Sequence, residues 1–430
     1  MKNNSPDVLQ VSVSKKGTML SRFWLKLGPG LVTGASDDDP SGIATYSQAG
    51  ALFGLSMLWT ALITFPLMAA VQEMCARVGM VTSAGLTGTL KKSYPKSILY
   101  LMILFSGPAI VLNIGADIAG MGAVSNLLFP HVHAGVFSIF YTVLLVVLII
   151  YLPYKKFASV LKYLCVILLV YLIVPFLVKQ DWGLMLRRTF IPEIKFNKAF
   201  IAMLVAILGT TISPYLFFWQ ASMEVEEQGE NRKVIMVDKS MIGRMRTDVY
   251  SGMFFSNLVM YFIILTTGTC LYQAGVHQID TVDQAALALK PLAGNGAYLL
   301  FAIGIIGTGL IAVPVLAGSL SYIISETFGW TEGLDKKFHE AKGFYIVIIF
   351  SLAVSLIINF IGISPIQALI YTAILYGLTS PVIIAIVMHI CNNKEVMGGQ
   401  VNGKWSNILG VATFLLMTVS GIMLIWFQFF

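Results

Sequence analysis

Charged residues are scarce in this chain. Only 11% of its 430 residues are Asp, Glu, Lys or Arg, whereas 57% are hydrophobic. Soluble globular domains carry about 25% charged residues, so the composition excludes an ordinary soluble domain. It indicates a protein that crosses a lipid bilayer several times.

Other absences narrow the function. The four cysteines lie in or beside apolar segments without the spacing of metal ligands, and the five histidines do not cluster. This argues against a disulfide framework and against a fixed structural metal site. The chain also lacks a paired nucleophile and base, a phosphate-binding loop and a redox motif. We therefore predict that it is not an enzyme and that it needs no cofactor.

The net charge of +7 comes from basic residues whose positions match a membrane topology. Most Lys and Arg residues fall in the N-terminal tail and in alternate loops, which is the pattern of cytoplasmic loops. Residues 179–198 are an exception, because they place several basic residues in a loop expected outside. The distribution argues against a nucleic-acid partner and predicts a cytoplasmic N-terminus. Residues 1–19 are polar and show no cleavable signal peptide.

Apolar runs near the length that crosses a bilayer predict eleven transmembrane helices. They are residues 28–51, 55–78, 98–128, 134–152, 158–178, 199–222, 248–272, 297–325, 344–362, 366–390 and 407–428. An odd number of spans places the C-terminus outside. We predict a cytoplasmic tail over residues 1–27 and one transmembrane domain over 28–430. The Gly- and Ser-containing stretch 81–96 predicts short cytoplasmic helices.

The first span contains three carboxylates and a proline in the stretch GASDDDPSG. An ionised Asp at the bilayer centre costs roughly 2.5–3.5 kcal/mol, so it normally faces a cavity or a cation. Pro40 removes a backbone donor and predicts a break in the helix. We therefore predict that Asp39 and the unwound turn bind a cation in the middle of the membrane. Asp37 and Asp38 point elsewhere on the helix, and their favoured interpretation is vestibule charge.

The sixth span has a matching interruption. In TTISPYLFFWQAS, Pro214 leaves the carbonyl of Thr210 without its helical partner. That carbonyl and the Ser213 hydroxyl are candidate oxygen ligands, although Ser and Thr in such helices often only bond back to their own backbone. Breaks five spans apart are typical of an inverted five-plus-five repeat, here about residues 28–178 and 199–390, with residues 407–428 as an extra helix. A chance pair of kinked helices is the alternative.

These two breaks resemble a known family. GASDDDPSG resembles the DPGN signature in the first helix of Nramp metal-ion transporters, and TTISPYLFFWQAS is similar to their MPHN stretch in the sixth. The resemblance extends over nearly the whole apolar chain and implies a LeuT-type fold. It also implies that Asp39, Gly42, the Thr210 carbonyl, Ser213 and Gln367 contact the metal ion, Gln367 standing near the glutamine of the family's tenth helix.

Two departures from the family motifs concern the metal ligands. Gly42 stands where the family has Asn, and Ser213 stands where it has the metal-binding Met. A thioether favours later transition ions, whereas oxygen ligands suit Mg²⁺ and Ca²⁺. Mg²⁺ keeps several waters, so a roomier oxygen site suits it. The sequence therefore resembles the Nramp-related magnesium transporters more than the manganese and iron members.

Two further departures concern protons. In LNIGADIAGMGA, Asp117 matches the first acid of the family's proton-transfer pair, but Gly120 replaces the second. Tyr215 replaces a histidine of the sixth helix, and a tyrosine does not relay protons near neutral pH. This predicts transport without obligatory proton coupling. Asp117 has two interpretations that stay open, a cavity acid and a structural acid paired inside the bundle.

The function predicted from these observations is transport of divalent cations, favouring Mg²⁺ and also passing Mn²⁺, by alternating access. The alternatives are a proton-coupled Mn²⁺/Fe²⁺ importer, a Na⁺-coupled organic-solute symporter of the same fold, and a membrane scaffold that does not transport. The acid in the first break argues against a carboxylate-bearing solute. The expected partners are divalent ions and the lipid bilayer, with no obligatory protein partner, and the expected location is a bacterial cytoplasmic membrane.

Overall fold

The structure is a computed structural model that describes residues 28–152, 170–227, 238–360 and 362–429. Its regular secondary structure in these ranges is helical, without strands. Eight helical segments in the described residues are at least 18 residues long and apolar enough to cross a bilayer. They agree with eight of the predicted spans, and the predicted span 158–178 lies largely outside the described residues.

The long helices follow the predicted order along the chain. They are α4 (Trp59–Thr82), α6 (Lys96–Leu128), α7 (Ala134–Tyr151), α11 (Lys198–Thr211) with α12 (Pro214–Glu227), α13 (Lys239–Cys270), α16 (Ala297–Phe328), α17 (Lys342–Ile358), α18 (Pro365–Asn392) and α20 (Lys404–Phe429). The first span is split into α2 (Pro29–Asp37) and α3 (Pro40–Phe53).

Shorter elements connect the spans. They are α5 (Leu86–Ser93), α9 (Val170–Leu177), α10 (Trp182–Phe190), α14 (Val282–Ala286), α15 (Lys290–Ala293), α19 (Lys394–Met397) and the 3₁₀ turns η1 (Gly54–Met57), η3 (Leu287–Leu289) and η4 (Gly294–Gly296). Helix α5 confirms the predicted short helix in 81–96. Helix α13 begins nine residues before the predicted apolar run at 248, because Lys, Arg and Met are good helix formers that extend it past the apolar part.

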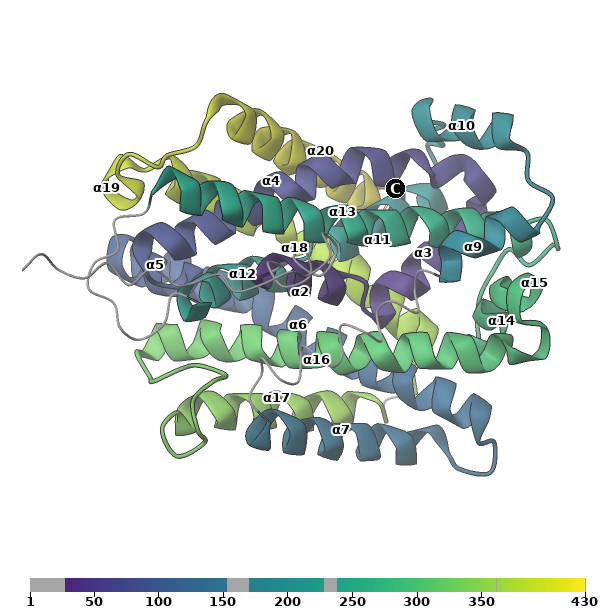
Figure 1. The fold of residues 1–430 in the computed structure, drawn as a ribbon, viewed down its shortest axis with the longest axis horizontal. Helices are drawn as coiled ribbons and strands as arrows, with labels where there is room; N and C mark the ends of the chain where they lie inside the picture. Colours follow the sequence, from purple (N-terminus) through teal and green to yellow (C-terminus); the bar gives the residue numbers. More distant parts are fainter. Residues whose placement is uncertain (1–27, 153–169, 228–237, 361, 430) are drawn as a thin grey trace, which may run out of the picture.

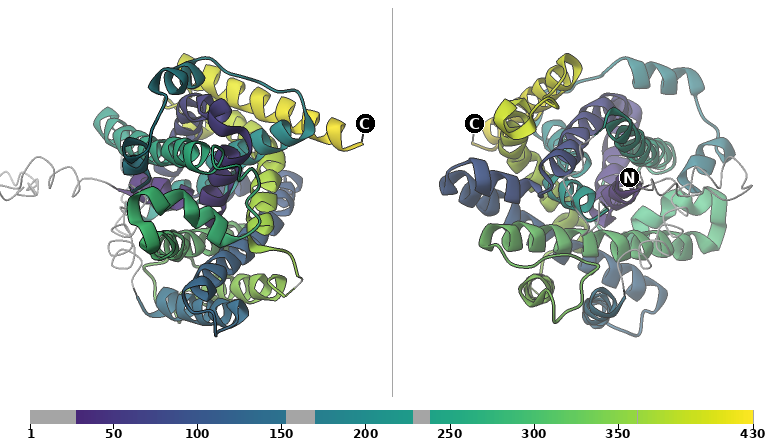
Figure 2. Two further views of the ribbon diagram at one scale, coloured as in Figure 1. Left: turned by 90° about the vertical axis from the view of Figure 1, so that its right-hand side faces the viewer. Right: turned by 60° about the vertical axis from the view of Figure 1, so that its left-hand side comes forward.

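The broken helices lie at the centre of the bundle, and complete helices surround them (Figure 1; Figure 2). Nearly all of the segment Lys198–Glu227 is buried, whereas only about a third of α7 and of α20 is buried. In Figure 1, α16, α7 and α17 lie on one side of the centre, and α4 and α20 lie on the other. The arrangement places both breaks where they are shielded from the surroundings.

Helix α2 packs unusually closely against α13. A Cβ added at Gly34 would lie 2.3 Å from the carbonyl oxygen of Gly252, so neither backbone could approach as closely with a larger residue at this crossing. The Asp248 carboxylate accepts hydrogen bonds from the amides of Gly28 at 2.8 Å and Gly30 at 2.7 Å. A carboxylate at a helix N-terminus is favourable because the first amides lack helical partners. These contacts fix α2 along its whole length.

A buried ion pair joins three segments near one end of the bundle. Arg77, which is 2% exposed, donates to Glu73 at 3.2 Å on the next turn of α4. Arg246 of α13 donates to the other oxygen of Glu73 at 2.9 Å. Arg77 also donates to the Gln400 carbonyl at 2.9 Å. The pair therefore links α4, α13 and the loop before α20.

Candidate metal-ion site

Asp39 sits in the break of the first span and caps the helix that follows. Its Oδ1 accepts a hydrogen bond from the amide of Gly42 at 2.6 Å, and Pro40 occupies the first helical position. Asp at the N-cap and Pro directly after it are the residues that favour a helix start. Asp39 is only 2% exposed. The local sequence thus places one carboxylate in the interior, beside the positive end of α3.

An amide from α6 completes the immediate surroundings of Asp39. Asn113 Nδ2 donates to Asp39 Oδ2 at 2.9 Å. Thr372 of α18 in turn donates to Asn113 Oδ1 at 3.0 Å and lies 3.3 Å from the Ser41 hydroxyl. Sequence reasoning missed Asn113. The available signal was its spacing, because Asn113 precedes Asp117 by four residues and so shares its face of the helix.

Asp117 lies on α6 within electrostatic reach of Asp39. It is fully buried, and within the described part of the chain neither carboxylate oxygen makes a hydrogen bond of good geometry, although the Ser41 backbone faces the carboxylate. No ion pair joins it to a basic side chain in the part of the chain that the structure describes. Among the described residues, therefore, Asp117 has no basic partner of the kind that a paired structural acid would need.

The break of the sixth span presents oxygen atoms that partly satisfy one another. Ser213 Oγ donates to the Thr210 carbonyl at 2.6 Å and lies 3.0 Å from the Gly209 carbonyl. Thr210 and Ser213 are 2% and 1% exposed. The back-bonded alternative for Ser213 is thus the arrangement in this structure, and an ion that used the Thr210 carbonyl would compete with this hydrogen bond.

Two hydrogen bonds join the two breaks. The Tyr215 hydroxyl at the start of α12 donates to the Ser36 carbonyl in α2 at 2.8 Å. The hydroxyls of Tyr46 in α3 and Thr211 in α11 lie 3.2 Å apart. The break that holds Asp39 and the break that holds Thr210 and Ser213 are therefore neighbours in space.

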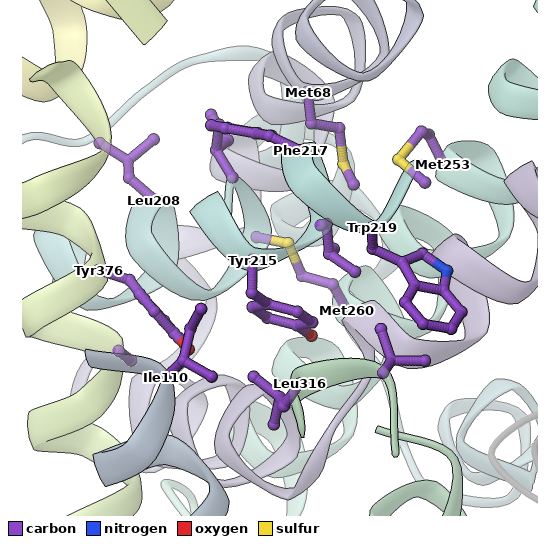
Figure 3. Packing of buried hydrophobic residues seen from close by; sticks show 14 of the residues in the cluster. Met68, Ile110, Leu208, Tyr215, Phe217, Trp219, Met253, Met260, Leu316 and Tyr376 are labelled. Carbon is purple, nitrogen blue, oxygen red and sulfur yellow. The ribbon is translucent and has the colours of Figure 1, made fainter. Parts of the chain in front are cut away.

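Apolar side chains and Tyr376 close the space around Tyr215 (Figure 3). The rings of Tyr215 and Tyr376 lie side by side with centroids 5.8 Å apart, flanked by Ile110, Leu316 and Met260. Both tyrosines are buried. Because Asp39 is also buried, an ion at Asp39 would need the bundle to open toward one face before it could enter or leave.

Gly42 and Gly120 stand where larger polar residues would meet close neighbours. A Cβ at Gly42 would lie 3.1 Å from the Asp37 carbonyl oxygen and 3.3 Å from the Tyr46 ring. A Cβ at Gly120 would lie 3.3 Å from Leu369. The space that the family's Asn and Glu would use is thus partly taken by neighbouring groups.

Gln367 does not lie with the residues around Asp39. It is exposed at the start of α18 and lines a separate cavity of about 230 Å³ together with Gln48 and Gln278. Thr372, five residues later, is the α18 side chain that reaches the Asp39 network. Short motifs fixed the position of the family's glutamine on α18 only to within one residue. In the structure, Gln367 lies outside the group of residues around Asp39.

Asp37 and Asp38 do not form a vestibule. They are 0% and 4% exposed, and both carboxylates approach Ser256 of α13. The vestibule interpretation was wrong because α2 lies inside the bundle, against α13, over its whole length.

A large acidic cavity lies elsewhere, between the ends of α12 and α16 and the loop that follows α16. It encloses about 740 Å³ and is lined by Glu226, Glu326, Glu332, Asp335 and Glu340, among others. Burial, together with the charges of Glu326 and Glu226, raises the pKa of Glu332 to about 9, and Lys336 opposes this shift. The cavity thus gathers acidic side chains close to the positions that sequence analysis predicts to be cytoplasmic, and Glu332 keeps its proton near neutral pH.

Comparison with known proteins identifies a family. Residues 30–427 match the family described as "Natural resistance-associated macrophage protein-like", Nramp. A divalent metal cation transporter MntH of Caldanaerobacter subterraneus subsp. tengcongensis is 23% identical over 95% of this chain and 94% of its own length. The MntH of Brucella suis biovar 1 is 24% identical over 97% of this chain and 91% of its own. The relatives are transporters and not enzymes.

Solved structures share the fold. A mutant of the Eremococcus coleocola manganese transporter superposes with a TM-score of 0.74 at 17% identity, covering 95% of this chain and 88% of that one. The nucleobase-cation symporter Mhp1 in a closed conformation gives 0.58 at 11% identity, covering 94% and 92%. The predicted all-helical, LeuT-type membrane fold is therefore confirmed. Together with the family match over most of its length, this shows that the chain belongs to the Nramp family.

Proposed function

We propose that this protein carries divalent metal cations across the membrane by alternating access, with Asp39 as the charged ligand. The observation that carries the proposal is a buried carboxylate in a helix break, with no ion pair to a basic residue among the described residues. A buried carboxylate needs compensation. The names of the protein's relatives, divalent metal cation transporter and manganese transporter, support a metal ion as the transported substrate.

We further propose that the preferred ion is Mg²⁺, with Mn²⁺ also passing. The two breaks offer a carboxylate and a backbone carbonyl, and the side chain that competes for this carbonyl at position 213 is a hydroxyl and not a thioether. Oxygen ligands suit Mg²⁺, which retains part of its water shell.

Transport without obligatory proton coupling is the third part of the proposal. Tyr215 is engaged with a backbone carbonyl, and Gly120 is packed against Leu369. Neither position offers a group that titrates near neutral pH. Asp117 remains as a buried acid, whose charge attracts the cation together with Asp39.

The proposal is tested by Mg²⁺ influx into proteoliposomes, recorded with an internal Mg²⁺-sensitive dye. Asp39→Asn keeps the side-chain volume and removes the charge, and it should abolish influx. The matched control is Asp283→Asn, an exposed acid at the start of α14, which should leave influx unchanged. Normal influx through Asp39→Asn would show that Asp39 is not the ligand.

A further inference from the structure

A groove opens on the outside of the bundle, between α6, α18 and the end of α17. It encloses about 330 Å³. Leu112, Ile363 and Tyr371 at its rim are exposed, whereas Ala116 and Thr372 at its floor are only 2% and 5% exposed. The groove is therefore a recess that reaches from the surface to buried side chains.

The lining of this groove is apolar. None of the described residues that line it carries a charge, and the polar ones are Asn359, Tyr371 and Thr372. Apolar cavities exclude water. Because α6 and α18 are both long and apolar enough to cross a bilayer, the groove faces lipid. These properties favour a hydrocarbon chain as the occupant over water or an ion.

The dimensions of the groove fit a single acyl chain. Its lining residues Ala368 and Leu375 lie seven residues apart on α18, which is about 10 Å along the helix axis. Ile363 continues the lining into the loop before α18, and the hydrocarbon core of one leaflet is about 15 Å deep. Over 10–15 Å, the volume of about 330 Å³ gives a cross-section of about 20–30 Å². An α-helix about 10 Å across needs about 80 Å², so the groove is too narrow for a helix of a second copy.

One polar atom marks the end of the groove. Asn359 is the C-cap of α17, and its Nδ2 is buried without a hydrogen-bond partner in the part of the chain that the structure describes. A buried donor without an acceptor is costly, and hydrocarbon supplies no water to pair with it. The predicted topology places this end of α17 at the outer face, where the polar part of a lipid begins. A lipid oxygen at this level would satisfy the donor.

We propose that the groove binds one acyl chain of a phospholipid of the outer leaflet, and that the ester carbonyl of this chain accepts a hydrogen bond from Asn359. The chain lies along α18 and ends against Thr372. Thr372 donates to Asn113, which in turn donates to Asp39. The bound lipid thus packs against a side chain that is two hydrogen bonds away from the proposed metal ligand.

Photolabelling in vesicles tests the inference. The full chain is reconstituted with a small fraction of a phospholipid that carries a diazirine midway along one acyl chain, and after irradiation the labelled residues are mapped by mass spectrometry. Lipid around the bundle labels exposed faces such as those of α7 and α20 in any case. We expect label also on Ala116 and Thr372 at the buried floor. Label confined to the exposed faces would overturn the inference.

Matched variants separate the groove from the rest of the surface. Ala368→Phe and Ala119→Phe fill it from opposite walls, and each should abolish labelling of the floor, so that one variant serves if the other does not fold. Ala412→Phe adds the same ring at an exposed position of α20 and should leave floor labelling unchanged. Asn359→Leu keeps the size and removes the donor, and it should reduce floor labelling by about 2- to 13-fold, the value of one hydrogen bond. Equal floor labelling in all four variants would overturn the proposal.

Two further measurements identify the occupant. A free fatty acid with the diazirine on the same carbon lacks the ester, so it should label the floor more weakly than the phospholipid at equal mole fraction. Stronger labelling by the fatty acid would overturn the assignment to a phospholipid. A dimer in detergent that Ala368→Phe converts to a monomer would overturn it as well, because the groove would then bind a second copy. None of these measurements depends on ion transport, so the inference and the proposed function can fail separately.

Discussion

The Ser213 side chain allows the choice of ligands to be tested in two steps. Its hydroxyl donates to the Thr210 carbonyl at 2.6 Å, so an ion that binds this carbonyl competes with a hydrogen bond. Ser213→Ala removes the competitor and adds no ligand. A hydrogen bond contributes about 0.5–1.5 kcal/mol net, which corresponds to about 2- to 13-fold in Kd. We therefore expect tighter binding of Mg²⁺ and Mn²⁺ by that factor, with their ratio unchanged.

Ser213→Met removes the same competitor and also introduces a thioether. Because sulfur favours Mn²⁺ over Mg²⁺, we expect a shift of about tenfold toward Mn²⁺ relative to Ser213→Ala, or about 1.4 kcal/mol. Ser213 is 1% exposed, so the larger side chain forces repacking that costs about 1–3 kcal/mol. That cost applies to both ions and cancels in the ratio.

The assay is competitive uptake into proteoliposomes supplied with both ions, followed by elemental analysis of the vesicle contents. Comparing Ser213→Met with Ser213→Ala isolates the effect of sulfur from the effect of the freed carbonyl. An unchanged Mn²⁺/Mg²⁺ ratio in Ser213→Met would refute the argument from ligand softness. An equal change in both variants would show that the carbonyl, not the sulfur, sets the preference.

Three further variants test other parts of the structure. Asp117→Asn removes a buried acid near Asp39, whose charge contributes on the order of 1–4 kcal/mol in a protein interior, so calorimetry should show cation binding weakened about fivefold or more. An unchanged Kd would assign Asp117 no electrostatic role. Glu73→Gln leaves Arg77 buried without its carboxylate. Denaturation in detergent should show that the free energy of unfolding falls by about 3–5 kcal/mol. A loss below about 1 kcal/mol would mean that the ion pair does not stabilise the fold. The pKa of Glu332 is raised from about 4.5 to about 9, so the folded state holds a proton that the unfolded state releases, and stability should fall as pH rises between these values. Glu332→Gln should remove that part of the slope in thermal unfolding measured from pH 5 to 9, and an identical slope would contradict the shift.

The breaks of the first and sixth spans were predictable because their causes are local. Proline lacks the amide proton that a helix needs, and Asp before it is a strong N-cap. The structure accordingly starts α3 at Pro40 and α12 at Pro214. Length and apolar character likewise predicted the spans, because a bilayer imposes both.

Contacts between helices were not predictable in the same way. The hydrogen bond from Asn113 to Asp39 depends on the rotation of α6, and short motifs do not fix the rotation of one helix against another. The same limit explains why Gln367 was assigned to the site and Thr372 was not. Asp37 and Asp38 were misplaced because the closeness of α2 and α13 depends on paired glycines far apart in the sequence.

The central claim is that this protein moves a divalent ion without moving protons, and one recording tests it most directly. Proteoliposomes that hold the unmodified protein, an internal dye that reports Mg²⁺ or Mn²⁺ and an internal pH dye are given external Mg²⁺ and, in a parallel recording, external Mn²⁺. We predict Mg²⁺ entry without internal acidification. Acidification that accompanies Mn²⁺ entry, with no entry of Mg²⁺, would contradict the claim and assign the protein to proton-coupled manganese transport.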